Sequence, residues 1–151
     1  MPFTYDYPMS SLAVDIILDT KEDIYMIRRL KDPFKDKIAF VGGFVEPDET
    51  FKEAALRELK EETGFSPRGM EYLEFVTILD RPNRDERSRV VSCVFKLELY
   101  SPPDLVASDD AKSIEVIPKG LHTFIASDFA FDHAEVLSNV FRDFFRNVGV
   151  C

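Results

Sequence analysis

The chain has 151 residues and a formal net charge of −9, and 45% of its residues are hydrophobic. This length fits a single domain over residues 1–151 that buries its own core. The acidic balance argues against a nucleic-acid-binding protein, which needs excess Lys and Arg to neutralise phosphates. The sequence has neither the roughly 18 consecutive apolar residues of a membrane helix nor a secretion signal. We therefore expect no membrane partner and a cytoplasmic location, where the two cysteines stay reduced.

The first third of the chain contains three segments rich in strand-forming residues. Residues 11–18 and 24–30 flank a polar turn at residues 19–23, and this arrangement predicts a β-hairpin. Residues 37–41 are predicted to form a short third strand. The glycine pair at residues 42–43 is expected to end that strand.

A helix is predicted over residues 50–63, which carry good helix formers throughout. Asp48 or Glu49 stands near the position of the N-cap. Gly64 follows the last helical residue as a stop signal.

Two more strands are predicted in the second half of the chain. They cover residues 72–79 and 89–99, with the polar segment 80–88 between them. Residues 101–112 are expected to form an exposed loop. Since strands outnumber helices and do not alternate regularly with them, the expected class is α/β, with helices packed on a mixed sheet.

The last predicted helix begins at Asp132, and Asp132 and Glu135 fit an Asp-x-x-Glu cap. His133, beside this cap, is expected to be structural rather than catalytic. Residues at helical spacing form one apolar stripe, which predicts core or dimer contacts rather than a cofactor site. They are Leu137, Phe141, Phe144, Phe145 and Val148.

One face of the helix predicted over residues 50–63 gathers three carboxylates. At about 100° of rotation per residue, Glu58, Glu61 and Glu62 fall within an arc of roughly 100°. Crowded carboxylates repel one another, and hard oxygen ligands at this density suit Mg²⁺ or Mn²⁺. Arg57, just outside the arc, can pair with one of them. Taken alone, this segment also fits an exposed charged helix.

The loop before this helix adds possible ligands. Gly42 and Gly43 permit a sharp turn and close approach of the backbone to a ligand. Their carbonyl groups can complete the coordination shell of a metal. Glu49 would stand at the entrance of the helix, within reach of the same site.

Residues 43–65 match the pattern Gly-x5-Glu-x7-Arg-Glu-U-x-Glu-Glu-x-Gly-U, where U is aliphatic or aromatic. Every fixed position is present: Gly43, Glu49, Arg57, Glu58, Leu59, Glu61, Glu62, Gly64 and Phe65. In this segment, which we call the box, the chain resembles the Nudix hydrolases. The resemblance implies a Nudix-type α/β/α sandwich with a mixed β-sheet, in which the box forms a loop–helix–loop.

The resemblance also implies roles for the box residues. In that family the residues matching Glu58, Glu61 and Glu62 bind divalent metal, often together with the carbonyl of the residue matching Gly43. The residue matching Arg57 orients the glutamates. The implied cofactor is Mg²⁺, with Mn²⁺ as a possible substitute, and the implied reaction is attack of metal-activated water on phosphorus.

Segments outside the box resemble the ADP-ribose pyrophosphatase branch of the family, which converts ADP-ribose and water to AMP and ribose 5-phosphate. They lie at residues 7–8, 14–15, 84–92, 109–111 and 131–134. The implied partner is thus a small nucleotide. Two departures stand out: Val41 replaces the usual proline before the glycine pair, and the usual tryptophan is missing around residues 114–117, which puts an aromatic platform there in doubt.

Substrate contacts are expected from arginines and from the glycine loop. Arginines end the second predicted strand and cluster before the late strand, and some of them can clamp a diphosphate through bidentate hydrogen bonds, although neighbouring acidic residues offer them ordinary salt bridges. They are Arg28, Arg29, Arg81, Arg84, Arg87 and Arg89, of which Arg28, Arg84 and Arg87 are our candidates. Gly42 and Phe44 are further candidates for substrate binding.

The catalytic base is left open by the sequence. Glu58 or Glu62 of the box is one possibility. A loop carboxylate from Asp109, Asp110 or Glu115 is the other.

Other functions remain open at this point. The same chemistry can serve NADH, a dinucleoside polyphosphate or an oxidised nucleotide, because substrate discrimination lies in the pocket. A non-catalytic module that senses ADP-ribose is the alternative from another class. The apolar segments near the N-terminus and the Phe-rich last helix leave room for a homodimer.

Overall fold

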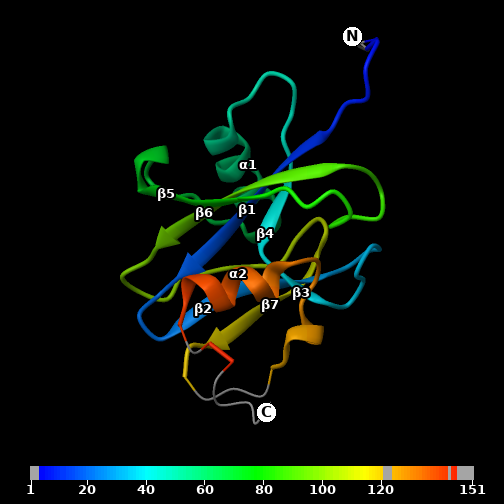
Figure 1. The fold of residues 1–151 in the computed structure, drawn as a ribbon. Helices are drawn as coiled ribbons and strands as arrows, with labels where there is room; N and C mark the ends of the chain where they lie inside the picture. The colour runs from blue at the N-terminus through cyan, green and yellow to red at the C-terminus, as the bar shows by residue number, and fades with distance from the viewer. Residues whose placement is uncertain (1–3, 121–123, 143, 146–151) are drawn as a thin grey trace.

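The structure is a computed structural model that describes residues 4–120, 124–142, 144 and 145. Strands and helices follow one another along the chain as shown in Figure 1. Their bounds are β1 Ser11–Asp19, β2 Asp23–Arg29, β3 Ile38–Ala39, β4 Val41–Phe44, α1 Phe51–Thr63, β5 Leu73–Leu79, β6 Val90–Glu98, β7 Ala111–Pro118 and α2 His133–Val140, with short 3-10 helices at Met70–Tyr72 and Ala126–Asp128.

The strands form one mixed sheet in the order β3-β2-β1-β6-β5, with β4 paired to β1 and β7 paired to β2. The central strands β1 and β6 are parallel, whereas the other pairs are antiparallel. Strand β1 pairs with β2 only at its last two residues, Leu18 and Asp19, and with β4 along residues 13–16. The predicted hairpin is therefore confirmed, but its two strands separate beyond their shared end.

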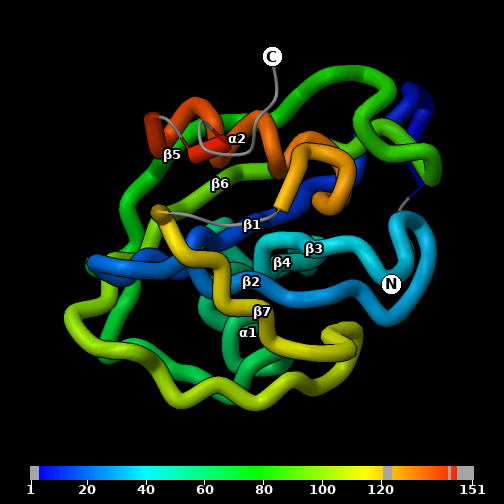
Figure 2. Tube along the Cα trace, turned by 90° about the horizontal axis from the view of Figure 1, so that it is seen from below, coloured from blue at the N-terminus to red at the C-terminus, as the bar shows by residue number. Residues whose placement is uncertain are grey.

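The two α-helices cover opposite faces of the sheet (Figure 2). Residues of β1 alternate between the faces: Ile16 and Leu18 pack in the cluster that contains Leu59 of α1. Ile17, which points the other way, packs in the cluster that contains Leu137 of α2. Because each face of the sheet buries apolar side chains against its own helix, the α/β/α sandwich with a mixed sheet is confirmed.

Helix α1 has a well-defined cap at each end. Its N-cap is Thr50, directly after Asp48 and Glu49. The Thr50 hydroxyl accepts a hydrogen bond from the amide of Glu53 at 3.2 Å, and the Glu53 carboxylate accepts one from the Thr50 amide at 2.7 Å. Gly64 ends the helix in the left-handed region, at φ 73°, as its position predicts.

The third predicted strand and the segment after residue 110 differ from expectation, whereas residues 101–110 form the predicted loop. The third strand divides at Phe40 into β3 and β4, and Gly42 and Gly43 lie inside β4 because they pair with Asp15 and Val14 of β1. Strand β7 was not predicted. Its two buried residues, Ala111 and Ile117, are separated by an irregular series of half-buried and exposed ones. The apolar alternation typical of a strand is therefore weak, and its pairing with β2 holds it in the sheet.

The last helix is shorter than predicted. It ends at Val140, and Phe144 follows in a turn but still packs in the cluster of α2. Val148 lies outside the described residues. Asp132 is the N-cap but makes no side-chain cap hydrogen bond, because its carboxylate binds Arg84 instead.

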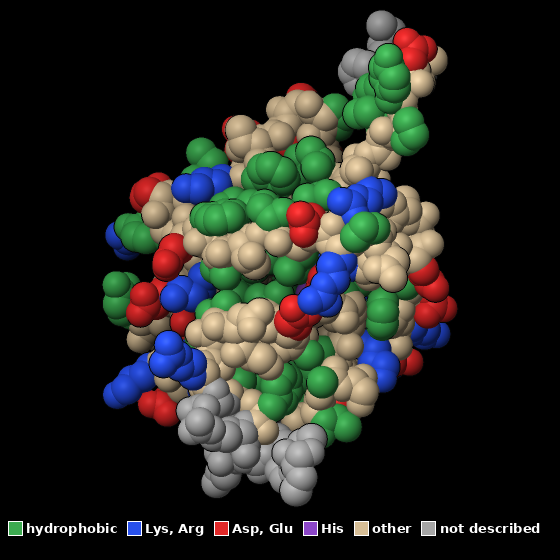
Figure 3. Space-filling view, viewed as in Figure 1, with side chains coloured by type: hydrophobic (Ala, Val, Ile, Leu, Met, Phe, Trp, Pro, Cys, Tyr) green, Lys and Arg blue, Asp and Glu red, His purple; other side chains and the backbone are tan. Residues whose placement is uncertain are grey.

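An extended segment, residues 4–10, leads into β1 and projects beyond the sheet (Figures 1 and 3). It carries exposed aromatic and apolar side chains, including Tyr7 and Met9. Among the described residues, every helix is too short or too polar to cross a membrane.

Replacing Gly64 with alanine should lower the free energy of unfolding by about 1–2 kcal/mol, since an L-residue is disfavoured in the left-handed region. Gly120→Ala is the matched control, because an added Cβ meets open space at both positions and only Gly64 has a positive φ. Urea denaturation measures both variants. Equal losses would contradict the conformational explanation.

Candidate active site

A cleft of about 550 Å³ opens where β1 separates from β2. Its walls come from β1, β2, β4 and α1, together with the first residue of α2 and several loop residues. These are His133 of α2 and, from the loops, Arg84, Asp85, Arg87, Asp110 and Phe131, among others. A second groove of about 440 Å³ lies between β5 and α2 and contains no residue of the box. The first cleft, which contains carboxylates of the box, is therefore the candidate active site.

Helix α1 presents Glu58 and Glu62 to this cleft. The amide of Gly42 donates a hydrogen bond to Glu62 Oε2 at 3.3 Å. At Gly43 an added Cβ would overlap the Glu58 carboxylate, so a larger residue there would have to displace that carboxylate. Strand β4 and helix α1 thus bring Gly43, Glu58 and Glu62 to one place.

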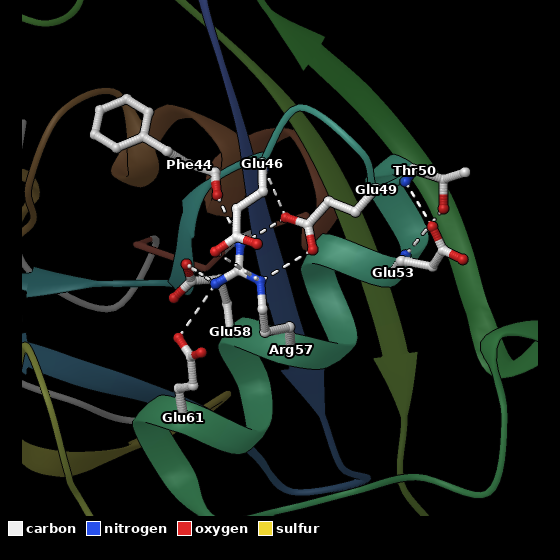
Figure 4. A network of polar contacts seen from close by, with 8 residues as sticks. All are labelled: Phe44, Glu46, Glu49, Thr50, Glu53, Arg57, Glu58 and Glu61. Carbon is white, nitrogen blue, oxygen red and sulfur yellow. Dashed lines mark hydrogen bonds and ion pairs between the residues drawn. The ribbon is translucent and has the colours of Figure 1, made fainter. Parts of the chain in front are cut away.

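Arg57 joins the loop after β4 to the helix (Figure 4). Its guanidinium donates to both carboxylate oxygens of Glu49, at 2.6 and 3.0 Å, and to the carbonyl oxygen of Phe44 at 2.9 Å. It also donates to Glu58 at 2.9 Å and to Glu61 at 3.2 Å. The hydrogen bonds to Glu49 are the main cause of the raised pKa of Arg57, so its charge is permanent.

Too little positive charge surrounds the two carboxylates in the cleft, Glu58 and Glu62. Burial, and then the neighbouring Glu58, raise the pKa of Glu62 to about 9. Burial also raises the pKa of Glu58, even though Arg57 acts in the opposite direction. A cation placed between these carboxylates would relieve both effects, and oxygen donors suit a hard divalent ion. The residues present therefore fit a divalent metal.

Glu61 does not line the cleft. Its side chain is 45% exposed and binds Arg57. Among the described residues, no group of three or more His, Cys, Asp or Glu side chains is close enough together to hold a metal ion. The structure thus brings together Gly43, Glu58 and Glu62 of the expected metal set, but leaves Glu61 on Arg57.

A buried polar network includes two residues of the cleft lining, Asp15 and His133. The Nδ1 atom of His133 accepts a hydrogen bond from the Phe40 amide at 3.2 Å, so its ring proton is on Nε2, which faces Asp15 Oδ1 at 3.5 Å. Ser92 donates to the other oxygen of Asp15 at 2.6 Å. Burial raises the pKa of Asp15, but His133, Ser92 and Arg84 lower it further than burial raises it. His133 thus has the structural position that the sequence predicts.

The arginines predicted to clamp a diphosphate already hold carboxylates. Arg84 binds both oxygens of Asp132, at 2.7 and 2.9 Å, and Arg87 binds both oxygens of Asp85, at 2.7 and 3.0 Å. The guanidinium of Arg87 also lies 5.0 Å from the ring centroid of Phe44. Arg84, Arg87, Phe44 and Gly42 all line the cleft, but both arginines are neutralised there.

Arg28 and Glu115 are not brought to the cleft. Arg28 Nε lies 2.8 Å from Glu115 Oε1, and its Nη1 donates to the carbonyl of Asp36. Since successive residues of a strand point to opposite sides, the neighbouring Arg29 lines the cleft instead.

Of the loop carboxylates, Asp110 lines the cleft. The loop before it is tied to the C-terminal end of α1, because the amides of Val106 and Ser108 donate to the carbonyls of Thr63 and Glu62, both at 3.0 Å. These hydrogen bonds satisfy carbonyl groups that a helix end leaves free. They also hold Asp110 near enough to raise the pKa values of Glu58 and Glu62.

Sequence reasoning assigned no role in the site to Asp15 and Phe131, and it did not separate Arg29 from its neighbour Arg28. Asp15 was seen only as part of a short family segment, although a charged residue inside an apolar strand signals a buried polar contact. Arg29 could not be separated from Arg28 without knowing which side of β2 meets the cleft. Phe131 lines the cleft at φ 51° and lies under the guanidinium groups of Arg29 and Arg84, a contact that no local pattern reveals.

Comparison with known proteins shows which family this chain resembles. The NUDIX domain profile matches residues 9–140. An ADP-ribose pyrophosphatase of Methanocaldococcus jannaschii is 38% identical over 141 residues, covering 90% of this chain and 76% of the relative. An 8-oxo-dGTP diphosphatase of Escherichia coli is 38% identical over 64 residues, which are 42% of this chain and 50% of that protein.

Solved structures show the same fold. A MutT/nudix family protein from Enterococcus faecalis superposes with a TM-score of 0.80 at 28% identity, over 90% of this chain and 62% of that chain. A bifunctional NMN adenylyltransferase/ADP ribose pyrophosphatase from Francisella tularensis, complexed with AMP and a Mn ion, gives a TM-score of 0.77 at 28% identity. That match covers 93% of this chain and 43% of the Francisella chain, so this chain spans less than two thirds of either protein.

Without added metal, Glu62→Gln should stabilise the protein at alkaline pH. Because the folded-state pKa of about 9 exceeds the ordinary value of 4.5, the folded state retains a proton that the unfolded chain releases between these values. The free energy of unfolding of the wild type therefore falls as the pH rises through this window. In EDTA, urea denaturation should show the variant more stable by on the order of 2 kcal/mol at pH 8 and nearly equal at pH 5. A margin independent of pH would refute this explanation.

Proposed function

Because the chain belongs to the Nudix hydrolase family, we propose that it hydrolyses the diphosphate bond of ADP-ribose to give AMP and ribose 5-phosphate. The observation that carries the choice of substrate is the 38% identity to the archaeal ADP-ribose pyrophosphatase over 90% of this chain. The similarity to the 8-oxo-dGTP diphosphatase covers less than half of the chain and gives weaker support for an oxidised nucleotide.

We propose that Mg²⁺, with Mn²⁺ as a substitute, binds at Glu58, Glu62 and the carbonyl of Gly43. Support comes from the raised pKa values of both glutamates, which show that the cleft lacks positive charge. Glu61 would join them after leaving Arg57. When bound, the ion supplies positive charge beside the diphosphate and makes coordinated water more acidic.

The remaining proposed roles belong to the chain itself. Arg57 holds the rotamer of Glu58 and fixes the glycine loop through Phe44 and Glu49. Asp110, carried into the cleft by the loop tied to α1, is the loop carboxylate that we assign as general base. The backbone of Gly42 and the ring of Phe44 contact the substrate.

In this proposal, the two neutralised arginines of the cleft position aromatic rings instead of binding phosphate. Arg87, held by Asp85, keeps the ring of Phe44 in position. Arg84 does the same for the ring of Phe131. Both arginines would thus shape the cleft wall that meets the substrate.

Purified protein with Mg²⁺ should hydrolyse ADP-ribose to AMP and ribose 5-phosphate with a higher kcat/KM than it hydrolyses NADH, a dinucleoside polyphosphate or 8-oxo-dGTP. The measurement is a substrate panel with metal titration, in which products are identified by chromatography. Chelation by EDTA should abolish the reaction. Tight binding of ADP-ribose without hydrolysis would instead favour the sensing module.

Three carboxylate variants test the assigned residues within the same assay. Glu62→Gln and Asp110→Asn should each lower kcat by about 100-fold or more, the usual scale for loss of a general base or of a metal-dependent step. Glu115→Gln, a carboxylate of β7 outside the cleft, should change kcat less than about twofold. Normal turnover by Glu62→Gln would refute the metal site.

We also propose that the chain forms a homodimer. Support comes from the N-terminal segment, where Tyr7 is 80% and Met9 is 60% exposed although both are large apolar residues. The Phe-rich last helix gives no such support, because Leu137 and Phe144 are buried in the chain's own core. Light scattering should give twice the chain mass of 17.4 kDa. A monomer at micromolar concentration would contradict the proposal.

A further inference from the structure

The chain changes strand partners at Phe40. Before this residue β3 pairs with β2, and after it β4 pairs with β1. The Phe40 amide lies at the break and donates to Nδ1 of His133 at 3.2 Å. Both residues are buried, and a buried amide costs stability unless it has an acceptor. The imidazole of His133 supplies that acceptor and thereby fixes the point at which β4 begins.

The same ring faces the strand that runs beside β4. Nε2 of His133 lies 3.5 Å from Asp15 Oδ1, and Ser92 of β6 donates to the other oxygen of Asp15 at 2.6 Å. Asp15 pairs with Gly42 of β4, and a Cβ added at Gly42 would lie 2.9 Å from Asp15 Oδ1. His133, at the start of α2, thus engages both strands of the β1–β4 pair.

Strand β4 makes two consecutive contacts with the glutamates of α1. The Gly42 amide donates to Glu62 Oε2 at 3.3 Å. At the next residue, Gly43, an added Cβ would overlap the carboxylate of Glu58. These contacts begin two residues after the amide that His133 holds. Because β4 has four residues and pairs, among the described strands, with β1 alone, a shift at its start would reach both glutamates.

We infer that His133 is a positioning residue for the metal site of α1: by holding the start of β4, it sets how Gly42 and Gly43 approach the two glutamates. The inference rests on the proposed function for the identity of this site as a metal site. Both ring nitrogens are directed at groups of the chain, so the imidazole acts through β4 rather than on a substrate. Residues that support metal ligands in this way commonly control metal affinity.

Two substitutions of His133 separate the two contacts of its ring. His133→Asn places an amide oxygen near the position of Nδ1, so it can accept from the Phe40 amide, but it is too short to reach Asp15. His133→Gln reaches toward Asp15 and lacks an acceptor near the position of Nδ1. The inference requires the contact with Phe40, so the two variants should differ.

Isothermal titration calorimetry with Mn²⁺, in the absence of any substrate, measures the effect on the site. His133→Gln should weaken Mn²⁺ binding by about 10-fold, the lower end of the range for residues that support metal ligands. His133→Asn should stay within about threefold of the wild type, because it retains an acceptor for the Phe40 amide. Hydrogen exchange of the Phe40 and Gly42 amides should be faster in His133→Gln than in the wild type.

Val136→Ala is the matched control. Val136 is buried on α2, three residues after His133, and packs in the core cluster of that helix. Its truncation should lower the melting temperature but leave Mn²⁺ affinity within about twofold of the wild type, because it does not contact β4. A purely structural role of His133 would lower the melting temperature of all three variants without separating their Mn²⁺ affinities.

A measurement on the wild type tests the same coupling if His133→Gln does not fold. Because coupling between two sites is reciprocal, saturating Mg²⁺ should slow hydrogen exchange of the Phe40 amide more than that of the Leu97 amide. Leu97 is buried in β6 and does not line the cleft. Equal slowing of both amides would contradict the inference.

Wild-type Mn²⁺ affinity in His133→Gln, or equal losses in all three variants, would overturn the inference. Absence of Mn²⁺ binding by the wild type would overturn it together with the proposed metal site. The proposed hydrolysis fails separately if the wild type binds Mn²⁺ but does not cleave ADP-ribose. In that case the Mn²⁺ affinities of the two His133 variants still decide whether this histidine positions the site.

Discussion

The guanidinium of Arg57 is the interaction on which the geometry of the site depends. It binds Glu49 and the carbonyl of Phe44 on the loop side, and Glu58 and Glu61 on the helix side. The carbonyl of Phe44 and the carboxylate of Glu49 would be repelled by the carboxylates of the helix without a cation between them. One delocalised cation with five donors satisfies both sides at once, and it keeps its proton at any pH at which the protein folds.

The cleft brings together carboxylates and arginines from different elements. Glu58 and Glu62 stand on α1, where burial makes their charged forms unfavourable without a cation. Three further arginines of the cleft have aromatic rings against them: Phe131 beside Arg29 and Arg84, and Phe44 beside Arg87. A ligand that combines phosphate with bound divalent metal complements both kinds of charge. An uncharged ligand would leave the glutamates without compensation.

Both faces of the sheet contribute to this single cleft. The glutamates belong to the helix on one face, whereas the start of α2, on the other face, supplies His133. The carboxylate of Asp132 binds Arg84 instead of capping α2. His133 links the amide of Phe40 to Asp15. Since these contacts are buried, the position of α2 and the shape of the cleft cannot change independently.

Local sequence was sufficient for the box helix, its glycine stop and the convergence of Glu58 and Glu62, because helical periodicity depends on nearest neighbours along the chain. The choice between Arg28 and Arg29 came only from the tertiary structure. Strand alternation separates the two arginines, but the pairing of β2 with β7 decides which side faces Glu115 and which the cleft. For the same reason Asp110, and not Glu115, reaches the cleft: hydrogen bonds between distant segments place its loop against α1. Such contacts depend on the packing of the whole chain, which no short stretch of sequence encodes.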